Sequence, residues 1–261
     1  MLTLGISPCP NDTFAFHKLV RDGDYEVVLD DIEALNQRAA EGEIDVVKVS
    51  VAAYGFIANK YALLRAGGAA GYGVGPIVVA KEPGEIMGRV AIPGERTTAA
   101  LLLRLAGHHE TVPMRFDKIE DAVLNGEVYA GVLIHEGRFT YEAKGLAKVT
   151  DLGALWEEAM GCPVPLGAIA IRRELGEETA RRVDDQIRAS VRYAQEHADA
   201  GRDAYVRAHA QEMEPDVVRR HIELYVNDYT LNLDERAVDQ MLDFGHGCGL
   251  FASPKQRVFA Y

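Results

Sequence analysis

A histidine at the end of an apolar run is the residue of this sequence best suited to acid–base chemistry. The run Val128–Ile134 is apolar at nearly every position, which is typical of a strand buried on both faces of a sheet, and it stops at His135. An imidazole has an unperturbed pKa of about 6.5, so it can accept or donate a proton at neutral pH. Open α/β sheets bind ligands at the carboxyl ends of their strands. The alternative is that His135 only caps the strand or satisfies a buried carbonyl group.

Two polar residues at the end of another apolar run could bind a small anion. The run Ile44–Val49 is predicted to be a buried strand, and it contains Lys48 and ends next to Ser50. A buried ammonium group requires a partner, so we expect Lys48 to pair with a carboxylate of the protein or of a substrate. Ser50 stands at the N-cap position of a helix predicted over residues 51–58, so its hydroxyl group could serve that helix alone.

The segment SPCPNDTF at Ser7–Phe14 follows a predicted strand over Leu2–Ile6. Its two prolines prevent further strand, and the sequence Pro-Asn-Asp predicts the start of a helix. This turn is either a rigid connection, or it presents backbone N–H groups and Asn11 to a ligand at the helix N-terminus. The spacing does not decide between the two, nor whether Cys9 contacts a ligand or fills space.

The elements that must position these residues occur in an order that repeats. A helix, the triplet Gly-Glu-Ile or Gly-Glu-Val, and a strand precede Ser50 and also precede His135, with the triplets at 42–44 and 126–128. Further strands are predicted over Met114–Phe116 and Ala168–Ile171, and residues 162–167 are expected to break regular structure. This order indicates two similar α/β lobes whose strand ends and helix starts face a shared cleft.

The predicted first lobe comprises residues 1–84 and 172–261, and the predicted second lobe comprises residues 85–171. Each lobe is expected to contain a mostly parallel sheet flanked by helices. The tail after Arg173 has helical periodicity and no strand pattern, so it is expected to pack on the first lobe. Two chain crossings between lobes are typical of type II periplasmic binding proteins. The predicted fold class is therefore α/β with that two-lobed architecture and a ligand cleft between the lobes.

A glycine-rich segment at 67–76 matches neither of the common phosphate-binding motifs. It lacks the Gly-Lys-Ser/Thr ending of a P-loop, and a predicted strand, not a helix, follows it. We interpret it as a wide turn between strands that allows a close approach of two backbones.

The composition excludes several classes of function. A formal net charge of −12 at pH 7 argues against nucleic-acid binding, because no run of Lys and Arg offsets it. Cys9, Cys162 and Cys248 lie far apart, so a zinc site or disulfide framework is not expected. No signal-peptide pattern is present, and no apolar stretch reaches the ~20 residues that span a membrane. We expect a cytoplasmic protein without nucleic-acid or membrane partners; its oligomeric state stays open, a homodimer included.

Five short motifs are spread along the chain. They are SPCPNDTF at Ser7–Phe14, KVS at Lys48–Ser50, GERTTA at Gly94–Ala99, HEGRFTY at His135–Tyr141 and PVPLG at Pro163–Gly167. Together they resemble the 1,4-dihydroxy-6-naphthoate synthase family of the futalosine route to menaquinone, and the resemblance extends over essentially the whole chain. Relatives commonly have PLPLG in the last motif, so Val164 is a mild departure from the family pattern.

The resemblance implies a two-lobed lyase that converts cyclic dehypoxanthine futalosine, a small-molecule carboxylate, to 1,4-dihydroxy-6-naphthoate and releases a three-carbon sugar fragment. By the family pattern His135 is the proton acceptor, and no metal or organic cofactor is expected. The substrate-binding positions of the family are matched by Lys48, Val49, Ser50, Thr98 and Ala99. Neighbouring motif residues complete the candidate set, namely Thr97, Cys9, Asn11, Pro165, Leu166 and Gly167.

Carbon–carbon cleavage of the retro-aldol type requires a base that removes a hydroxyl proton and a carbonyl group that takes up the electrons. We expect His135 to be that base, with N–H or hydroxyl groups near Thr98 and Ser50 stabilising the developing oxyanion. Chorismate dehydratase of the same pathway is an alternative with the same fold, but it would not share SPCPNDTF and HEGRFTY. A non-catalytic solute-binding protein is a second alternative, and the lack of an export signal and the base at a strand end count against it.

Overall fold

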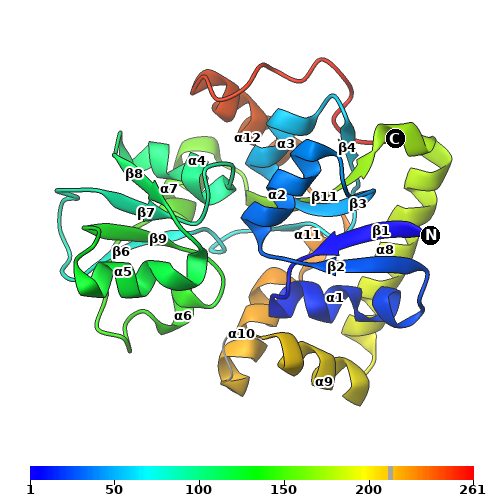
Figure 1. Cartoon of the computed structure of the whole chain (residues 1–261), viewed down its shortest axis with the longest axis horizontal. Helices are drawn as coiled ribbons and strands as arrows, with labels where there is room; N and C mark the ends of the chain where they lie inside the picture. The colour runs from blue at the N-terminus through cyan, green and yellow to red at the C-terminus, as the bar shows by residue number, and fades with distance from the viewer. Residues whose placement is uncertain (211–213) are drawn as a thin grey trace. The chain divides into compact units, whose positions relative to one another are not determined.

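The computed structural model describes residues 1–210 and 214–261 of the chain (Figure 1). The chain forms two units, of which the first comprises Met1–Gly71 and Pro165–Tyr261 and the second Tyr72–Val164. Each unit contains one β-sheet flanked by helices, so the predicted α/β fold with two lobes is confirmed. No helix in the described ranges is long and apolar enough to cross a membrane.

The sheet of the first unit has six strands in the order β2-β1-β3-β11-β4, and β5 also pairs with β11. Strands β2 and β3 lie parallel to β1, whereas β11 runs antiparallel to β3 and β4. All five residues of β3 are buried, as expected for a strand covered on both faces. The strands are β1 Leu2–Ile6, β2 Tyr25–Leu29, β3 Val46–Ser50, β4 Tyr61–Leu63, β5 Ala69–Gly71 and β11 Val164–Arg172.

The sheet of the second unit repeats this arrangement. Its order is β10-β6-β9-β7-β8, in which β8 and β9 lie parallel to β7, and β6 runs antiparallel to β9 and β10. β9, which precedes His135, thus lies between a parallel and an antiparallel neighbour, as does β3, which contains Lys48. This correspondence agrees with the internal repeat predicted from the sequence. The strands are β6 Ile77–Ala80, β7 Val90–Ile92, β8 Thr111–Pro113, β9 Ala130–Leu133 and β10 Ala147–Asp151.

Helices surround each sheet. The first unit contains α1 Pro10–Arg21, α2 Ile32–Glu41, α3 Val51–Ile57, α8 Gly176–Glu196, α9 Ala200–His209, α10 Pro215–Tyr225, α11 Asp228–Leu231 and α12 Glu235–Gly247. The second unit contains α4 Thr98–Leu103, α5 Ile119–Asn125, α6 Gly137–Thr140 and α7 Leu152–Met160. Short 3₁₀ turns cover Arg104–Ala106, Phe116–Lys118 and Arg173–Leu175. The helices after Arg173 all belong to the first unit, as the sequence predicted.

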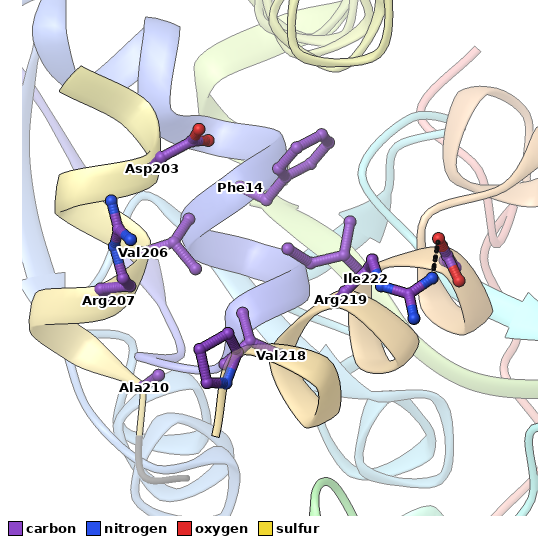
Figure 2. Close-up of a pocket in the computed structure, with 10 residues that line it drawn as sticks. Phe14, Asp203, Val206, Arg207, Ala210, Val218, Arg219 and Ile222 are labelled. Atoms are coloured by element: carbon purple, nitrogen blue, oxygen red, sulfur yellow. Dashed lines mark hydrogen bonds and ion pairs between the residues drawn. The ribbon is translucent and has the colours of Figure 1, made fainter. Parts of the chain in front are cut away.

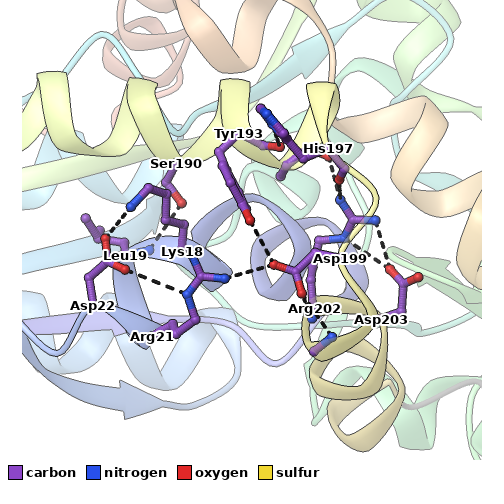
Figure 3. A network of polar contacts seen from close by, with 12 residues as sticks. Lys18, Leu19, Arg21, Asp22, Ser190, Tyr193, His197, Asp199, Arg202 and Asp203 are labelled. Atoms are coloured by element: carbon purple, nitrogen blue, oxygen red, sulfur yellow. Dashed lines mark hydrogen bonds and ion pairs between the residues drawn. The ribbon is translucent and has the colours of Figure 1, made fainter.

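The long helix α8 holds the core of the first unit together. Val183, Ile187 and Val191 recur every four residues along it, and they are buried in one cluster with side chains of α1 and the sheet. Polar contacts add to this packing: Ser190 Oγ donates to the carbonyl oxygen of Ala15 on α1 at 2.7 Å. Figure 3 shows that Ser190 and the groups around Asp199 connect α8 and α9 to α1.

In the second unit, two glycines allow α7 to lie against the segment before β6. A Cβ atom on Gly75 would stand only 2.2 Å from the Cα atom of Gly153, which is closer than real atoms approach. The two backbones can lie this close together because both residues are glycine. The close backbone approach predicted for the glycine-rich segment is therefore confirmed. Part of that segment is nevertheless strand β5, and not only turn.

The structure corrects four expectations. The sheets are mixed and not mostly parallel, because the crossing strands β6 and β11 enter each sheet antiparallel. The units meet in sequence at 71/72 and 164/165, earlier than the expected 84/85 and 171/172, since β6 pairs in the second sheet and β11 in the first. The strand expected over Met114–Phe116 lies at Thr111–Pro113. Residues 164–167, expected to be irregular, begin β11.

Candidate functional site

Lys48 has a protein carboxylate as its partner. Its Nζ atom donates to Asp12 Oδ1 at 2.9 Å and to the carbonyl oxygen of Gly67 at 2.8 Å. Both side chains of the ion pair are about 95% buried or more, since the exposed fractions are 5% for Lys48 and 3% for Asp12. Of the two partners that the sequence left open, the structure therefore supplies the carboxylate of the protein, which offsets the cost of burying the charge.

The turn SPCPNDTF holds that carboxylate in place. Ser7 donates to Asp12 Oδ2 from its hydroxyl group at 2.7 Å and from its backbone N–H at 3.3 Å. The side chain of Asn11 donates to Asp12 Oδ1 at 2.9 Å. Pro10 occupies the first turn of α1, where the missing N–H costs nothing, and Cys9 is the N-cap residue, with a buried thiol that is not part of a disulfide. The motif therefore fixes the position of the carboxylate that binds Lys48.

Ser50 does not serve its own helix. It occupies the N-cap position of α3, but its side chain accepts no capping hydrogen bond from that helix. Asn36 on α2 instead donates to Ser50 Oγ at 3.2 Å, and the backbone N–H of Ser50 donates to Asn36 Oδ1 at 2.9 Å. Asn36 is not among the residues predicted from the sequence. The available signal was a polar residue within the apolar face of α2, where Leu35 and Ala39 are buried.

The beginning of β11 lies beside Lys48 and Ser50. Gly167 is the register partner of Ser50, and a Cβ atom on this glycine would stand 3.1 Å from Lys48 Cε. Pro165 and Leu166 precede it on the same strand. The structure thus brings one group of the predicted residues together in the first unit, through β3, β11 and the turn before α1. This group, the Lys48 cluster, consists of Cys9, Asn11, Lys48, Val49, Ser50, Pro165, Leu166 and Gly167.

His135 follows β9 in the second unit and has an unusual backbone. Its φ of 54° makes it the one non-glycine residue with positive φ among those described. Side chains in this left-handed region cost roughly 1–2 kcal/mol, and such strain concentrates at functional sites. The imidazole is half-buried and contacts the ring of Phe116 edge-on, with ring centroids 5.0 Å apart.

The rest of HEGRFTY shapes the loop around His135. Arg138 donates to the carbonyl oxygen of Gly75 and lies 3.5 Å from the carboxylate of Asp151. Tyr141 is buried in the core of the second unit, and its hydroxyl group donates to Glu142 at 2.9 Å. These residues hold the loop onto the sheet.

Thr97, Thr98 and Ala99 form the start of α4 in the second unit. Thr97 is the N-cap: its hydroxyl accepts from the N–H of Ala100 at 3.1 Å and donates to the carbonyl oxygen of Gly94 at 2.8 Å. Thr98 and Ala99 form the first turn of α4, and both are buried. The second unit therefore carries His135 and this helix start, and the Lys48 cluster belongs to the first unit, although its strand β11 begins at Val164 in the second unit.

A cavity of about 410 Å³ lies elsewhere in the first unit, between α1, α9 and α10 (Figure 2). Its apolar lining includes Phe14, Val206, Val218 and Ile222, and charged groups stand at its edge. It contains none of the predicted site residues. Among the described residues, no group of three or more His, Cys, Asp or Glu side chains is placed to hold a metal ion.

The two sheets, their repeated strand order and the residues at their strand ends define a class of protein. A Candida albicans protein described as having the generic periplasmic binding protein fold matches with a TM-score of 0.69 at 10% identity, covering 97% of this chain and 91% of that chain. The ligand-binding component of an ABC-type import system from Staphylococcus aureus matches with a TM-score of 0.71 at 14% identity, covering 100% and 96%. The fold is thus that of the two-lobed binding proteins.

Residues 2–246 match the menaquinone biosynthesis family, and the chain belongs to that family. It is 46% identical to the 1,4-dihydroxy-6-naphthoate synthase of Thermus thermophilus, with 99% of this chain and 98% of that protein covered. Identity to the same enzyme of Streptomyces coelicolor is also 46%, with 90% and 88% covered. A crystal structure of an Archaeoglobus fulgidus protein matches with a TM-score of 0.90 at 37% identity over 96% of this chain and 98% of that chain.

Proposed function

We propose that this chain is a carbon–carbon lyase that converts cyclic dehypoxanthine futalosine to 1,4-dihydroxy-6-naphthoate, releasing a three-carbon sugar fragment. The observation that carries the proposal is the identity of 46% over nearly the whole length to a relative named as a synthase of 1,4-dihydroxy-6-naphthoate. The residues at the two strand ends support it, because they include a base and a cation that such a reaction can use. The same relatives favour this reaction over chorismate dehydration.

His135 is the proposed base. In a retro-aldol cleavage the imidazole removes the proton of a substrate hydroxyl group, the carbon–carbon bond breaks, and its electrons move to a carbonyl group in conjugation with it. N–H or hydroxyl groups of Thr98 and Ser50 stabilise the oxyanion that develops. Formation of the aromatic product supplies driving force for the step. The left-handed backbone of His135 supports this role, since strain of this kind persists where function requires it.

The remaining residues of the candidate set are proposed to bind the substrate. The Lys48 ammonium group has three hydrogen-bond donors, and two of them bind Asp12 and the carbonyl oxygen of Gly67. We assign the third donor to the substrate carboxylate. Val49 and Ser50 at the end of β3, and Thr98 and Ala99 at the start of α4, complete the binding positions. The hydroxyl group of Thr97 already serves as a helix cap, so this residue would contribute through its backbone.

The test is turnover by the purified chain. Cyclic dehypoxanthine futalosine and chorismate are offered separately, and products are followed by chromatography and mass spectrometry. Formation of 1,4-dihydroxy-6-naphthoate from the first substrate alone is the expected result. Dehydration of chorismate would assign the chain to the neighbouring step, and saturable binding without turnover would make it a binding protein. A cytoplasmic location is part of this proposal, and cell fractionation tests it. Light scattering measures the oligomeric state and shows whether the chain forms a homodimer.

A further inference from the structure

A buried line of hydrogen bonds connects α10 to the Lys48 ammonium within the first unit. His221 Nε2 lies 2.9 Å from Asn11 Oδ1, and Asn11 Nδ2 lies 2.9 Å from Asp12 Oδ1. The same Oδ1 atom accepts from Lys48 Nζ. His221 has no exposed surface, and Asn11 is 9% exposed, so water does not compete for these bonds. We infer that His221 is a positioning residue for Lys48, and this inference rests on the proposed role of Lys48 in substrate binding.

The charge of Asp12 fixes the direction of every hydrogen bond in this line. An ionised carboxylate only accepts, so Asn11 must turn its NH₂ group toward Asp12. The carbonyl oxygen of Asn11 therefore faces His221, and it can only accept. His221 must then carry a proton on Nε2. The tautomer of a histidine on α10 is thus set by the carboxylate that holds Lys48.

This line explains how a helix distant in sequence affects the cation. Asp12 Oδ1 is shared between Asn11 and Lys48, while Ser7 binds Oδ2, so three groups fix the rotation of the carboxylate. If the Nε2 donor were removed, the buried oxygen of Asn11 would lose its partner, and the amide would reorient to recover one. The carboxylate would then rotate, and the third N–H bond of Lys48 would no longer point at the same place.

A purely structural role for His221 is the competing explanation. The ring also packs against Tyr225, with centroids 4.6 Å apart, and α10 contacts α1. On the other hand, the cavity lined by Phe14, Val218 and Ile222 shows that apolar packing between α10 and α1 is incomplete (Figure 2). Loss of α10 packing alone would lower stability without changing the affinity for substrate, and this difference separates the two roles.

The kinetic test compares three variants with the intact chain, using cyclic dehypoxanthine futalosine. His221→Leu removes the donor, His221→Gln retains an N–H donor of similar reach, and Val218→Ala weakens the packing of α10 but leaves the hydrogen bonds. We expect His221→Leu to raise KM about tenfold with kcat within about twofold, because a buried acceptor is left unpaired. His221→Gln should return KM to near the starting value. An unchanged KM in His221→Leu, or an equal rise in Val218→Ala at equal loss of melting temperature, overturns the inference.

A second measurement does not depend on turnover. Nitrogen-15 NMR of the histidine side chains, with His221 assigned by its absence from His221→Leu, reports which ring nitrogen carries the proton. We expect Nε2 to carry a proton at the pH of the kinetic assay, because Asn11 Oδ1 can only accept. Protonation on Nδ1 alone would disprove the line of hydrogen bonds whatever the activity. An Nε2–H tautomer in a chain that shows no turnover would instead mean that the proposed function has failed.

Discussion

The backbone of Gly167 lies directly against the side chain of Lys48. A Cβ atom at this glycine would stand 3.1 Å from Lys48 Cε and 3.3 Å from the carbonyl oxygen of Val49, both closer than ordinary van der Waals contact. The absence of a side chain on β11 thus sets the position of the buried ammonium on β3. Because Gly167 is also the register partner of Ser50, one glycine shapes the surroundings of two candidate binding residues.

Gly167→Ala should therefore displace Lys48 by a few tenths of an ångström. We expect KM for the proposed substrate to rise about three- to tenfold, and the unfolding free energy to fall by about 1 kcal/mol through overpacking. Steady-state kinetics and urea denaturation measure the two effects. Ala168→Gly is the control, because it weakens the same strand without adding an atom near Lys48. A KM that rises equally in both variants would show that only strand stability matters.

His135→Asn tests the base. Asparagine tolerates the left-handed backbone but cannot act as a base at neutral pH, so kcat should fall by about 10²–10⁴-fold while KM changes little. Pre-steady-state and steady-state assays of 1,4-dihydroxy-6-naphthoate formation measure the loss. Asn36→Ala is a useful comparison, since it removes the contact to Ser50 but leaves the base in place, so its loss of kcat should be smaller than that of His135→Asn. Near-normal kcat in His135→Asn would remove the imidazole from the mechanism.

The strain at His135 predicts a separate effect on stability. At the φ of 54° found for residue 135, a glycine would be unstrained, whereas an alanine would be strained. The variants His135→Gly and His135→Ala both lack the imidazole, so their difference isolates the backbone. We expect His135→Gly to be more stable than His135→Ala by about 1 kcal/mol in urea denaturation. In ordinary helical backbone the order would be reversed, and equal stabilities would mean that the left-handed conformation is absent in solution.

The sequence was informative where a local pattern decides the structure. The apolar runs before Ser50 and His135 correctly predicted β3 and β9, because a buried strand needs nothing beyond its own residues to be recognised. Asp31 caps α2 and Gly42 ends it in a left-handed conformation, and both are ordinary local signals of helix ends. Prolines led to an error in β11, since Pro165 precedes the register pairs with β3 and so removes no hydrogen bond from that ladder.

Long-range partners could not be predicted. Asp12 pairs with Lys48 across 36 positions of sequence, and His221 reaches Asn11 across 210. Nothing in the spacing of either residue indicates the contact, because it arises only when α1, β3 and α10 have packed. The direction of a strand that crosses between units, such as β6, likewise depends on packing and not on its own residues. The hydrophobic pattern of β6 is that of any buried strand, and its antiparallel pairing with β9 depends on where the chain enters the second sheet.

The buried pair of Lys48 and Asp12 predicts a large stability effect. Lys48→Met leaves the carboxylate of Asp12 buried without its cation, which should cost about 3–5 kcal/mol of unfolding free energy in urea denaturation. The exposed pair of Lys18 and Asp22 on α1 provides the control, because Lys18→Met there should cost less than about 1 kcal/mol. In the double variant Lys48→Met, Asp12→Asn, the loss should be smaller than the sum of the single losses. Additive losses would contradict a direct interaction.

His17 on α1 predicts how stability depends on pH. Burial lowers the pKa of His17 below its usual value of 6.5, and the positive charges of Arg21 and Arg202 add to the effect, whereas Asp199 and Asp203 oppose it. Among the described residues, no group hydrogen-bonds to its buried Nδ1 atom. The imidazole is therefore neutral in the folded chain at neutral pH.

The sign of the effect follows from linkage. The pKa of His17 is lower in the folded chain than in the unfolded chain, so the unfolded chain binds more protons once the pH falls below about 6.5. The free energy of unfolding therefore decreases as the pH falls from that value through the pKa of the folded state. His17→Phe, which keeps an aromatic ring against Tyr205, has no such group. The unfolding free energy should therefore fall less between pH 7 and pH 5 (a window around the histidine pKa) in His17→Phe than in the unaltered chain. His108→Gln in an exposed loop is the control and should follow the unaltered chain. Equal slopes for all three proteins would mean that His17 titrates as it does in the unfolded state.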